Sequence, residues 1–351
     1  MELIGIAEQF DVSGKVVSAE PYGMGHINDT FLVTAGRRYI LQRLNTSLFP
    51  EPDRLMENIR LVTEHVAKKL PHEKVLTLVP ARKGGCLVYD GGSAYRMYDF
   101  IERTECFQTA DAAHFARSGE VFGRFTAALD DFDASQLYDV LPKFHDTRKR
   151  FADFTAALDA NASGRADTCR PEIDFVLARE KYCPVFMDML ESGEIPYRVT
   201  HNDTKLNNVL FDLDSDGGAV IDLDTVMKGA AGFDFGDSIR FGASTAAEDE
   251  TDLDKVHFDI KLFTAYAEGY LKYMGGLLNG KEKETLAFSA ILLTYECGMR
   301  FLADYIAGDV YFKTHRPAHN LDRARTQFKL IAEMEAQLPG MNAVVAAACN
   351  R

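Results

Sequence analysis

Short β-prone runs, separated by glycines and polar turns, dominate the first hundred residues. The runs expected to form strands are Val16–Pro21, Thr30–Ala35, Tyr39–Leu44, Val75–Val79, Cys86–Tyr89 and Ala94–Ile101. One helix is expected from about Asp53 to Lys69, because apolar residues such as Leu55, Ile59 and Val62 recur there at helical spacing. The pattern therefore predicts a small sheet accompanied by one helix.

After Glu102 the pattern changes to longer helical stretches. The expected helices follow the apolar stripe Phe115, Phe122, Phe125 and Leu129, the segment Phe175–Leu190, the stripe Ile260, Phe263, Tyr266 and Tyr270, and the segment Thr285–Tyr305. A compact strand–loop–strand region, Arg198–Asp224, interrupts them. We therefore expect an α+β, two-lobed architecture: a sheet-rich N-lobe over residues 1–102 and a mainly helical C-lobe over 103–351, with Tyr98–Arg103 as the linker.

Composition narrows the class of protein. The 351 residues include 39 basic and 53 acidic side chains, a formal net charge of −14, which argues against nucleic acid or an anionic membrane as the main partner. The chain shows no signal-peptide start and no apolar run near the roughly 20 residues of a membrane span. Six scattered cysteines suit reduced thiols rather than disulfides or a zinc site. We expect a cytoplasmic globular protein.

The octet His201–Asn208 carries the strongest chemical signal. Its fixed positions read H-x-D-x-K-x-x-N, and a second acidic segment, Ile221–Asp224, follows after a turn. Protein kinases divide phosphoryl transfer in this way, with a catalytic-loop Asp, an Asn five residues on and a later Asp on the metal. Such transfer asks the protein mainly to position groups and to neutralise charge.

Each residue type in the octet suits one part of this reaction. The carboxylate of Asp203 can accept the proton of an attacking hydroxyl, and the Lys205 ammonium can face the transferring phosphoryl oxygens. Asn208 offers a neutral oxygen ligand for Mg²⁺, and His201 is expected to brace the loop. The bland alternative is a solvated polar turn, which the strand-like flanks and the following aspartates make less favourable.

The acidic segment is expected to complete the metal site. Asp222 follows the apolar run Ala219–Ile221, which reads as a buried strand, and Asp224 is a secondary candidate two residues on. Carboxylate oxygens are ligands that Mg²⁺ prefers. The alternative, an ordinary turn aspartate, suits Asp224 better than Asp222.

The nucleotide-holding elements are less defined. Gly23 and Gly25 stand in a glycine-rich segment between two expected strands, where backbone amides could approach phosphates, although such a segment is often only a turn. Kinases also need a cation on the third strand. Arg43 is the favoured candidate, with Gln42 standing where a Lys is expected. No G-x-x-x-x-G-K-[ST] motif occurs, which disfavours a P-loop kinase.

The cation's acidic partner is expected from the following helix. Glu57 is preferred over Glu64, which lies on the same helical face.

These residues together resemble the aminoglycoside phosphotransferase/choline kinase-like family, and most closely its N-acetylhexosamine 1-kinase branch. The segments that carry the resemblance are Gly23–Asn28, Tyr39–Asn45, His201–Asn208, Ile221–Thr225, Phe233–Gly242, Thr245–Glu250 and Gly298–Phe312. The octet is specific to the superfamily, and the later segments point to the sugar kinase branch. The resemblance implies a protein-kinase-like two-lobed fold.

The resemblance also implies a reaction. It is transfer of phosphate from ATP, with Mg²⁺, to the anomeric hydroxyl of N-acetylglucosamine or N-acetylgalactosamine. The residues that would hold the sugar are Asp203, His26, Phe241, Arg300 and Tyr311. Asp234 would brace the catalytic loop. The alternatives for the sugar-binding positions are a turn residue at His26, a surface ion pair at Arg300 and a packed aromatic at Tyr311.

Three other functions stay open. An aminoglycoside kinase would be favoured by acidic residues at the acceptor site, which suit a polycationic substrate. Arg300 at that site would argue against this function. A choline-type kinase would need an aromatic cage, which the absence of Trp makes less favourable. A non-catalytic, pseudokinase-like binding protein finds its support in Gln42, while Asp203, Asn208 and Asp222 argue against it. The sequence does not rank the hexosamines, the nucleotides or the oligomeric states.

Overall fold

The computed structural model describes residues 2–23, 27–109 and 111–350. The chain divides into two compact units, which we describe separately. The first unit comprises residues 1–106, 131–142 and 209–227, and the second comprises 107–130, 143–208 and 228–351. The lobe boundary expected at residue 102 stays a prediction, since the first unit also takes in segments far along the chain.

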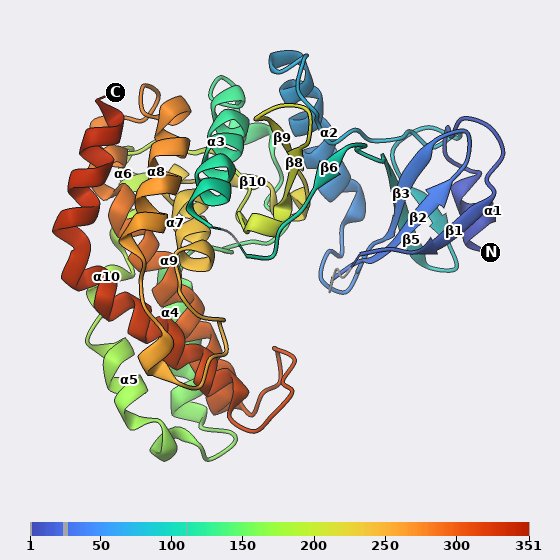
Figure 1. Ribbon diagram of the computed structural model, residues 1–351. Coiled ribbons are helices and arrows are strands. Elements are labelled where there is room, and N and C mark those ends of the chain that lie inside the picture. The colour runs from blue at the N-terminus through green and yellow to red at the C-terminus, as the bar shows by residue number, and fades with distance from the viewer. Residues whose placement is uncertain (1, 24–26, 110, 351) are drawn as a thin grey trace. The chain divides into compact units, whose positions relative to one another are not determined.

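An antiparallel five-stranded sheet organises the first unit (Figure 1). Its strands lie in the order β1-β2-β3-β5-β4 and comprise β1 Ser18–Pro21, β2 Asp29–Thr34, β3 Arg38–Arg43, β5 Ser93–Asp99 and β4 Val88–Asp90. The unit also contains the helices α1 Leu3–Ala7 and α2 Pro52–Lys69, and the small sheet β6 Thr104–Glu105, β8 Val209–Asp212 and β9 Gly218–Val220. The α+β class is confirmed.

The two faces of the five-stranded sheet differ in character. Tyr39 and Leu41 of β3 point into an apolar core that includes Ile6, Ala7 and Phe10 from the N-terminal segment. Because side chains alternate along a strand, Gln42 faces the opposite side. The strand register sets Thr30 of β2, Gln42 and Arg96 of β5 directly opposite one another. The sheet therefore has an apolar face and a face with a polar row.

One expected strand is not formed. Val75–Val79 makes a single isolated bridge, between Leu78 and Tyr98, instead of a strand. The Val79 amide donates to the Met97 carbonyl at 2.9 Å, and the Asp99 amide donates to the Thr77 carbonyl at 2.9 Å. Leu76 and Val79 of this run are buried, which accounts for its apolar pattern. An apolar pattern indicates burial, and burial alone does not distinguish a strand from a packed loop.

A buried amide connects three segments of the first unit. Asn58, on the inner face of α2, has no exposed surface. Its side-chain nitrogen donates to the carbonyls of Tyr138 and Val226 at 2.8 and 3.0 Å, and its oxygen accepts from the Tyr138 amide at 2.8 Å. The helix therefore holds the segment 131–142 and the end of the segment 209–227 through one side chain.

The second unit is helical. Its helices are α3 Ala112–Ala128, α4 Thr147–Ala160, α5 Arg170–Leu177, α6 Val185–Ser192, α7 Ala231–Gly242, α8 Ile260–Met274, α9 Gly280–Ala307 and α10 His319–Cys349. β7 Arg198–Thr200 pairs with β10 Met227–Gly229. Helix α9 packs against α4, α7 and α10, and α3 packs against α8. The expected segments around residues 115–129, 260–270 and 285–305 are confirmed as helices.

The single helix expected over Phe175–Leu190 is wrong. Two short helices, α5 and α6, are separated by a 3₁₀ turn at Glu180–Tyr182. Pro184 precedes the second helix and explains the break, because proline has no amide hydrogen to continue a helical ladder.

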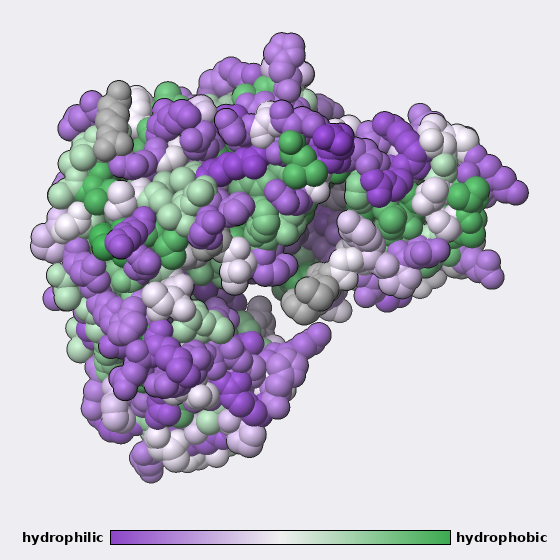
Figure 2. Space-filling model, in the orientation of Figure 1, coloured by the Kyte–Doolittle hydropathy of each residue, from purple (hydrophilic) through white to green (hydrophobic). Residues whose placement is uncertain are grey.

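Helix α9 is the one helix, among the described residues, that is long and apolar enough to cross a membrane. However, 78% of its apolar 18-residue stretch is buried inside the protein, as in the central helix of a helical core. The molecular face drawn in Figure 2 is mainly hydrophilic, with smaller apolar areas between polar ones. The length and apolarity of α9 are therefore weak evidence for a membrane span.

Candidate active site

The loop His201–Asn208, which carries the predicted catalytic residues, follows β7 in the second unit and is held by Asp234 of α7. The Asp234 carboxylate accepts hydrogen bonds from the amides of His201 and Asn202 at 2.8 and 2.7 Å. Burial raises the pKa of Asp234, although these two bonds work in the opposite direction. Asn202 adopts a left-handed backbone conformation, with φ of 65°, which the two bonds help to maintain. The expected bracing role of Asp234 is confirmed.

A second aspartate of α7 continues this support. Asp237 accepts a hydrogen bond from the Thr204 amide at 3.0 Å and pairs with Arg240 at 2.9 Å. Burial works to raise the pKa of Asp237, but the charges of Arg240 and Lys205 outweigh burial and lower it. The loop is thus held at His201, Asn202 and Thr204 by two aspartates of one helix.

Asp203, Lys205 and Asn208 form one hydrogen-bonded group. The Lys205 ammonium lies 2.7 Å from one carboxylate oxygen of Asp203. The Asn208 amide nitrogen donates to the Asp203 carbonyl at 2.8 Å and to the other carboxylate oxygen at 3.2 Å. Burial works to lower the pKa of Lys205, but Asp203 and Asp237 raise it. The lysine therefore stays charged beside the carboxylate.

This group can support the chemistry expected of it. The Asp203 side chain is 22% exposed, so its carboxylate is fixed by two partners and yet reachable by an acceptor hydroxyl. The Asn208 amide nitrogen is engaged within the loop, and its oxygen is of the type that Mg²⁺ prefers. The roles of Asp203, Lys205 and Asn208 in catalysis stay predictions that this geometry suits.

The predicted sugar-binding residues Arg300 and Tyr311 lie together in the second unit. The Arg300 guanidinium lies over the rings of Tyr311 and Phe312, at 5.8 and 5.4 Å from their centroids. Arg300 is half-buried, and Tyr311 is 65% exposed. Phe241, near the end of α7, is half-buried. The structure thus brings two of the predicted positions into contact and leaves both accessible.

Asp304 holds the loop that carries Tyr311. Its carboxylate accepts hydrogen bonds from the amides of Val310, Tyr311 and Phe312 at 2.8–2.9 Å. The preceding Gly308 has φ of 103°, a conformation that glycine adopts without strain. This role is not predictable from the sequence, since nothing in the pattern around Asp304 indicates an interaction with residues six to eight positions later.

In the first unit, Asp222 and Asp224 follow β9. Asp222 has a left-handed backbone, with φ of 60° and ψ of 58°. Asp224 is buried and accepts a hydrogen bond from the Asn28 amide nitrogen at 2.7 Å, and it forms an ion pair with Arg96. Asp224 was expected to be a second metal ligand. Both of its carboxylate oxygens instead accept hydrogen bonds from side chains of the protein.

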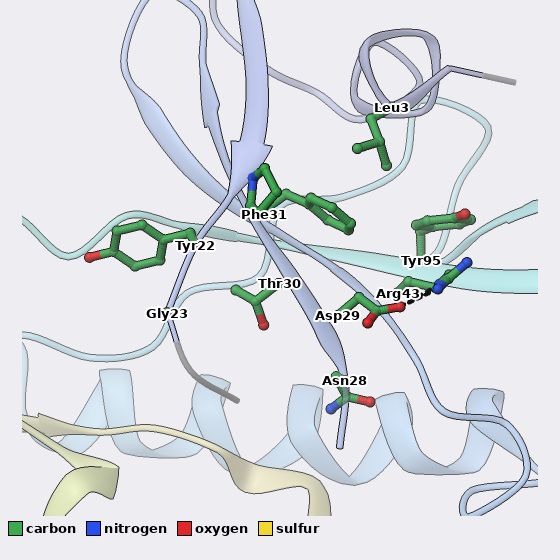
Figure 3. A pocket seen from close by; sticks show the side chains of 10 residues that line it. Leu3, Tyr22, Gly23, Asn28, Asp29, Thr30, Phe31, Arg43 and Tyr95 are labelled. Atoms are coloured by element: carbon green, nitrogen blue, oxygen red, sulfur yellow. Dashed lines mark hydrogen bonds and ion pairs between the residues drawn. The ribbon is translucent and has the colours of Figure 1, made fainter. Parts of the chain in front are cut away.

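A pocket of about 510 Å³ lies beside the expected nucleotide loop, within the first unit. Figure 3 shows Gly23, Asn28 and Thr30 along it, with the Arg43–Asp29 ion pair. Gly23 has φ of 76°, the left-handed conformation of a tight turn. Gly25 and His26, two of the predicted site residues, lie outside the described residues.

The ion pair expected between Arg43 of β3 and a glutamate of α2 is not among the contacts of the described residues, in which Arg43 and the two glutamates have other partners. Glu57 pairs with Arg60 of the same helix at 2.8 Å, and Glu64 pairs with Arg60 at 2.9 Å. Arg43 pairs with Asp29. The buried polar contact of α2 is made by Asn58 instead of a glutamate. Neither Glu57 nor Glu64 has its expected partner among the contacts of the described residues.

Comparison with known proteins identifies a family and a fold. A model described as the phosphotransferase enzyme family matches residues 18–272, a range that includes the catalytic loop and ends before Arg300. An aminoglycoside phosphotransferase from Alicyclobacillus acidocaldarius is similar in fold, with a TM-score of 0.60, 14% identity and coverage of 98% of this chain and 96% of that chain.

Two further solved structures share the fold. A choline kinase from Cryptosporidium parvum has a TM-score of 0.63, 12% identity and coverage of 99% of both chains. The amicoumacin kinase hAmiN, in complex with AMP-PNP, Ca²⁺ and Ami, has a TM-score of 0.55, 14% identity and coverage of 91% of this chain and 88% of that chain.

The family model and the fold thus define a small-molecule phosphotransferase with a kinase-like two-lobed architecture. The chain belongs to the phosphotransferase enzyme family. The solved structures that are similar to it in fold include an aminoglycoside phosphotransferase and a choline kinase.

Proposed function

We propose that this phosphotransferase uses ATP and Mg²⁺ to phosphorylate the anomeric hydroxyl of an N-acetylhexosamine. The observation that carries the kinase part is the Asp203–Lys205–Asn208 group, held by the two aspartates of α7. In this proposal Asp203 aims the acceptor hydroxyl and takes its proton, while the Lys205 charge offsets negative charge on the transferred group.

Magnesium, when bound with the nucleotide, would neutralise charge on the β- and γ-phosphates. We propose Asn208 and Asp222 as its ligands. The β8–β9 hairpin supports this pairing, because Val209 pairs with Val220. Asn208 directly precedes β8, and Asp222 follows shortly after β9. Both residues therefore adjoin the same end of the hairpin. We do not extend the metal proposal to Asp224, because both its oxygens already accept hydrogen bonds.

The choice of a sugar rests on the resemblance of the later segments and on Arg300. Its guanidinium already covers the faces of Tyr311 and Phe312. A choline-type ligand would need such faces for its own cation, and an aminoglycoside would meet a like charge there. A neutral amino sugar could instead accept hydrogen bonds from Arg300 through its acetamido or ring oxygens.

A panel of acceptors tests this proposal. N-acetylglucosamine, N-acetylgalactosamine, kanamycin and choline are each incubated with ATP, Mg²⁺ and protein, and the products are read by phosphorus NMR. We expect a sugar phosphate whose phosphorus couples to the anomeric proton, and no product with Asp203→Asn in the same time. Phosphorylation of choline or kanamycin alone would overturn the choice of sugar. Nucleotide binding without transfer to any acceptor would indicate a binding protein.

A further inference from the structure

The polar face of the five-stranded sheet carries a row of three connected side chains, all within the first unit. Gln42 of β3 donates to the Thr30 hydroxyl at 3.0 Å, and its amide oxygen accepts from the Arg96 guanidinium at 2.9 Å. Protein kinases carry their phosphate-binding lysine on the third strand. Here Gln42 stands at that position, and the positive charge comes from Arg96 on the neighbouring strand.

Arg96 is a buried cation with a defined counter-charge. It is 1% exposed, it pairs with Asp224, and its guanidinium lies 5.2 Å from the centre of the Tyr98 ring. Burial works to lower the pKa of Arg96, but the carboxylates of Asp224 and Asp222 help to raise it. The guanidinium therefore keeps its charge next to the segment that carries Asp222.

Arg43, the other candidate cation, has different surroundings. It faces the side of the sheet on which Tyr39 and Leu41 pack, since these residues alternate with Gln42 along β3. Its side chain is half exposed and pairs with Asp29, where Figure 3 shows it at the pocket. Its charge is thus directed away from the row that contains Gln42.

We propose that Arg96 is the positioning cation of the nucleotide site: it supplies from β5 the charge that β3 lacks, and through Asp224 it fixes the segment bearing Asp222. This inference rests on the proposed function. A buried ion pair adds little stability compared with apolar side chains of similar volume, so stability alone does not account for retaining it.

The test measures binding of a non-hydrolysable ATP analogue with Mg²⁺ by calorimetry, without any acceptor. Arg96→Gln should weaken binding roughly 10- to 100-fold. Arg43→Gln should change binding less than about twofold, because its ion pair is exposed. The exchange Gln42→Lys with Arg96→Gln returns the cation to β3 and should recover most of the lost affinity.

A second variant addresses folding, because Arg96→Gln leaves the Asp224 charge buried. Replacing both partners, Arg96→Met with Asp224→Leu, should keep the melting temperature near that of the wild type and still bind the nucleotide weakly. Full binding by this double variant, or weakened binding in Arg43→Gln instead, would overturn the inference. Absence of nucleotide binding by the wild type would overturn the proposed function itself, which separates the two failures.

Discussion

The amide nitrogen of Asn208 donates to both the carbonyl and the carboxylate of Asp203, at 2.8 and 3.2 Å. Asn208, which is proposed to bind the metal, and Asp203, which is proposed to take the proton, are therefore directly hydrogen-bonded to each other. A shift of either side chain moves the other, so the geometry of the loop is as important as the identity of its residues.

Asp203→Asn should lower kcat by about 10² to 10⁴, because the amide cannot accept the acceptor's proton. Nucleotide affinity should change little, since the substitution conserves volume. Steady-state kinetics with ATP and the best acceptor would measure the effect. Turnover equal to that of the wild type would show that Asp203 is not the base.

Arg300→Ala should raise the KM for the sugar about tenfold or more and leave the KM for ATP unchanged, because it removes a donor to the acceptor. Arg170→Ala is a matched control, since Arg170 is an exposed arginine paired with Asp174 on α5. A lowered melting temperature with unchanged kinetics would return Arg300 to a structural role.

Asn58→Ala should lower the free energy of unfolding by roughly 2–4 kcal/mol, because it leaves the Tyr138 amide and two carbonyls without their partner. Lys68→Ala, at an exposed position of the same helix, is the control and should be within about 0.5 kcal/mol of the wild type. Urea unfolding of the three proteins measures the difference. Equal values for both variants would mean that the buried amide of Asn58 contributes no more to stability than an exposed side chain of the same helix.

Gly123→Ala should destabilise the second unit by roughly 1–3 kcal/mol, because its new methyl group would lie 2.7 Å from the backbone oxygen of Tyr270 on α8. Gly276→Ala has nothing within 4 Å and serves as the control. Thermal unfolding would show the difference. A neutral result for Gly123→Ala would indicate that α3 and α8 can move apart at little cost.

Stability should depend on pH through Asp212 of the first unit. Burial works to raise the pKa of Asp212, but hydrogen bonds from Lys74, the Asp214 amide and Ser215 lower it from 3.8 to about 2. A lowered folded-state pKa stabilises the protein above the unfolded value, and the contribution is lost as the pH falls from about 4 toward 2. The full contribution is about 2 kcal/mol.

The measurement for Asp212 compares urea unfolding of the wild type and Asp212→Asn between pH 6 and pH 3. The stability advantage of the wild type should shrink as the pH falls. An advantage that stays constant over this range would show that the Asp212 carboxylate is not responsible.

The sequence predicted those parts of the site that depend on spacing along one short segment. Asp203, Lys205 and Asn208 meet because the loop is local, and Asp234 was identified through the resemblance. The β-strands of the sheet were also found, because period-two patterns and turn glycines are local signals.

Contacts that depend on strand register or on distant segments were not predictable in this way. Arg96 meets Gln42 only through the pairing of β3 with β5, and it meets Asp224 only through a fold that brings distant segments together. Asn58 likewise looks like any polar residue of a helix until its partners at 138 and 226 are known. Val75–Val79 failed as a strand because an apolar run reports burial and not hydrogen bonding.

The ion pair between Arg96 and Asp224 joins residues 128 positions apart in the chain. A ribosome that adds about 5–20 residues per second would need roughly 6 to 25 seconds between synthesising the two. During that interval the nascent sheet holds an arginine whose counter-charge does not yet exist. The N-terminal part of the chain should therefore complete its folding only after residue 224 has emerged, and a fragment that ends earlier should be prone to aggregate.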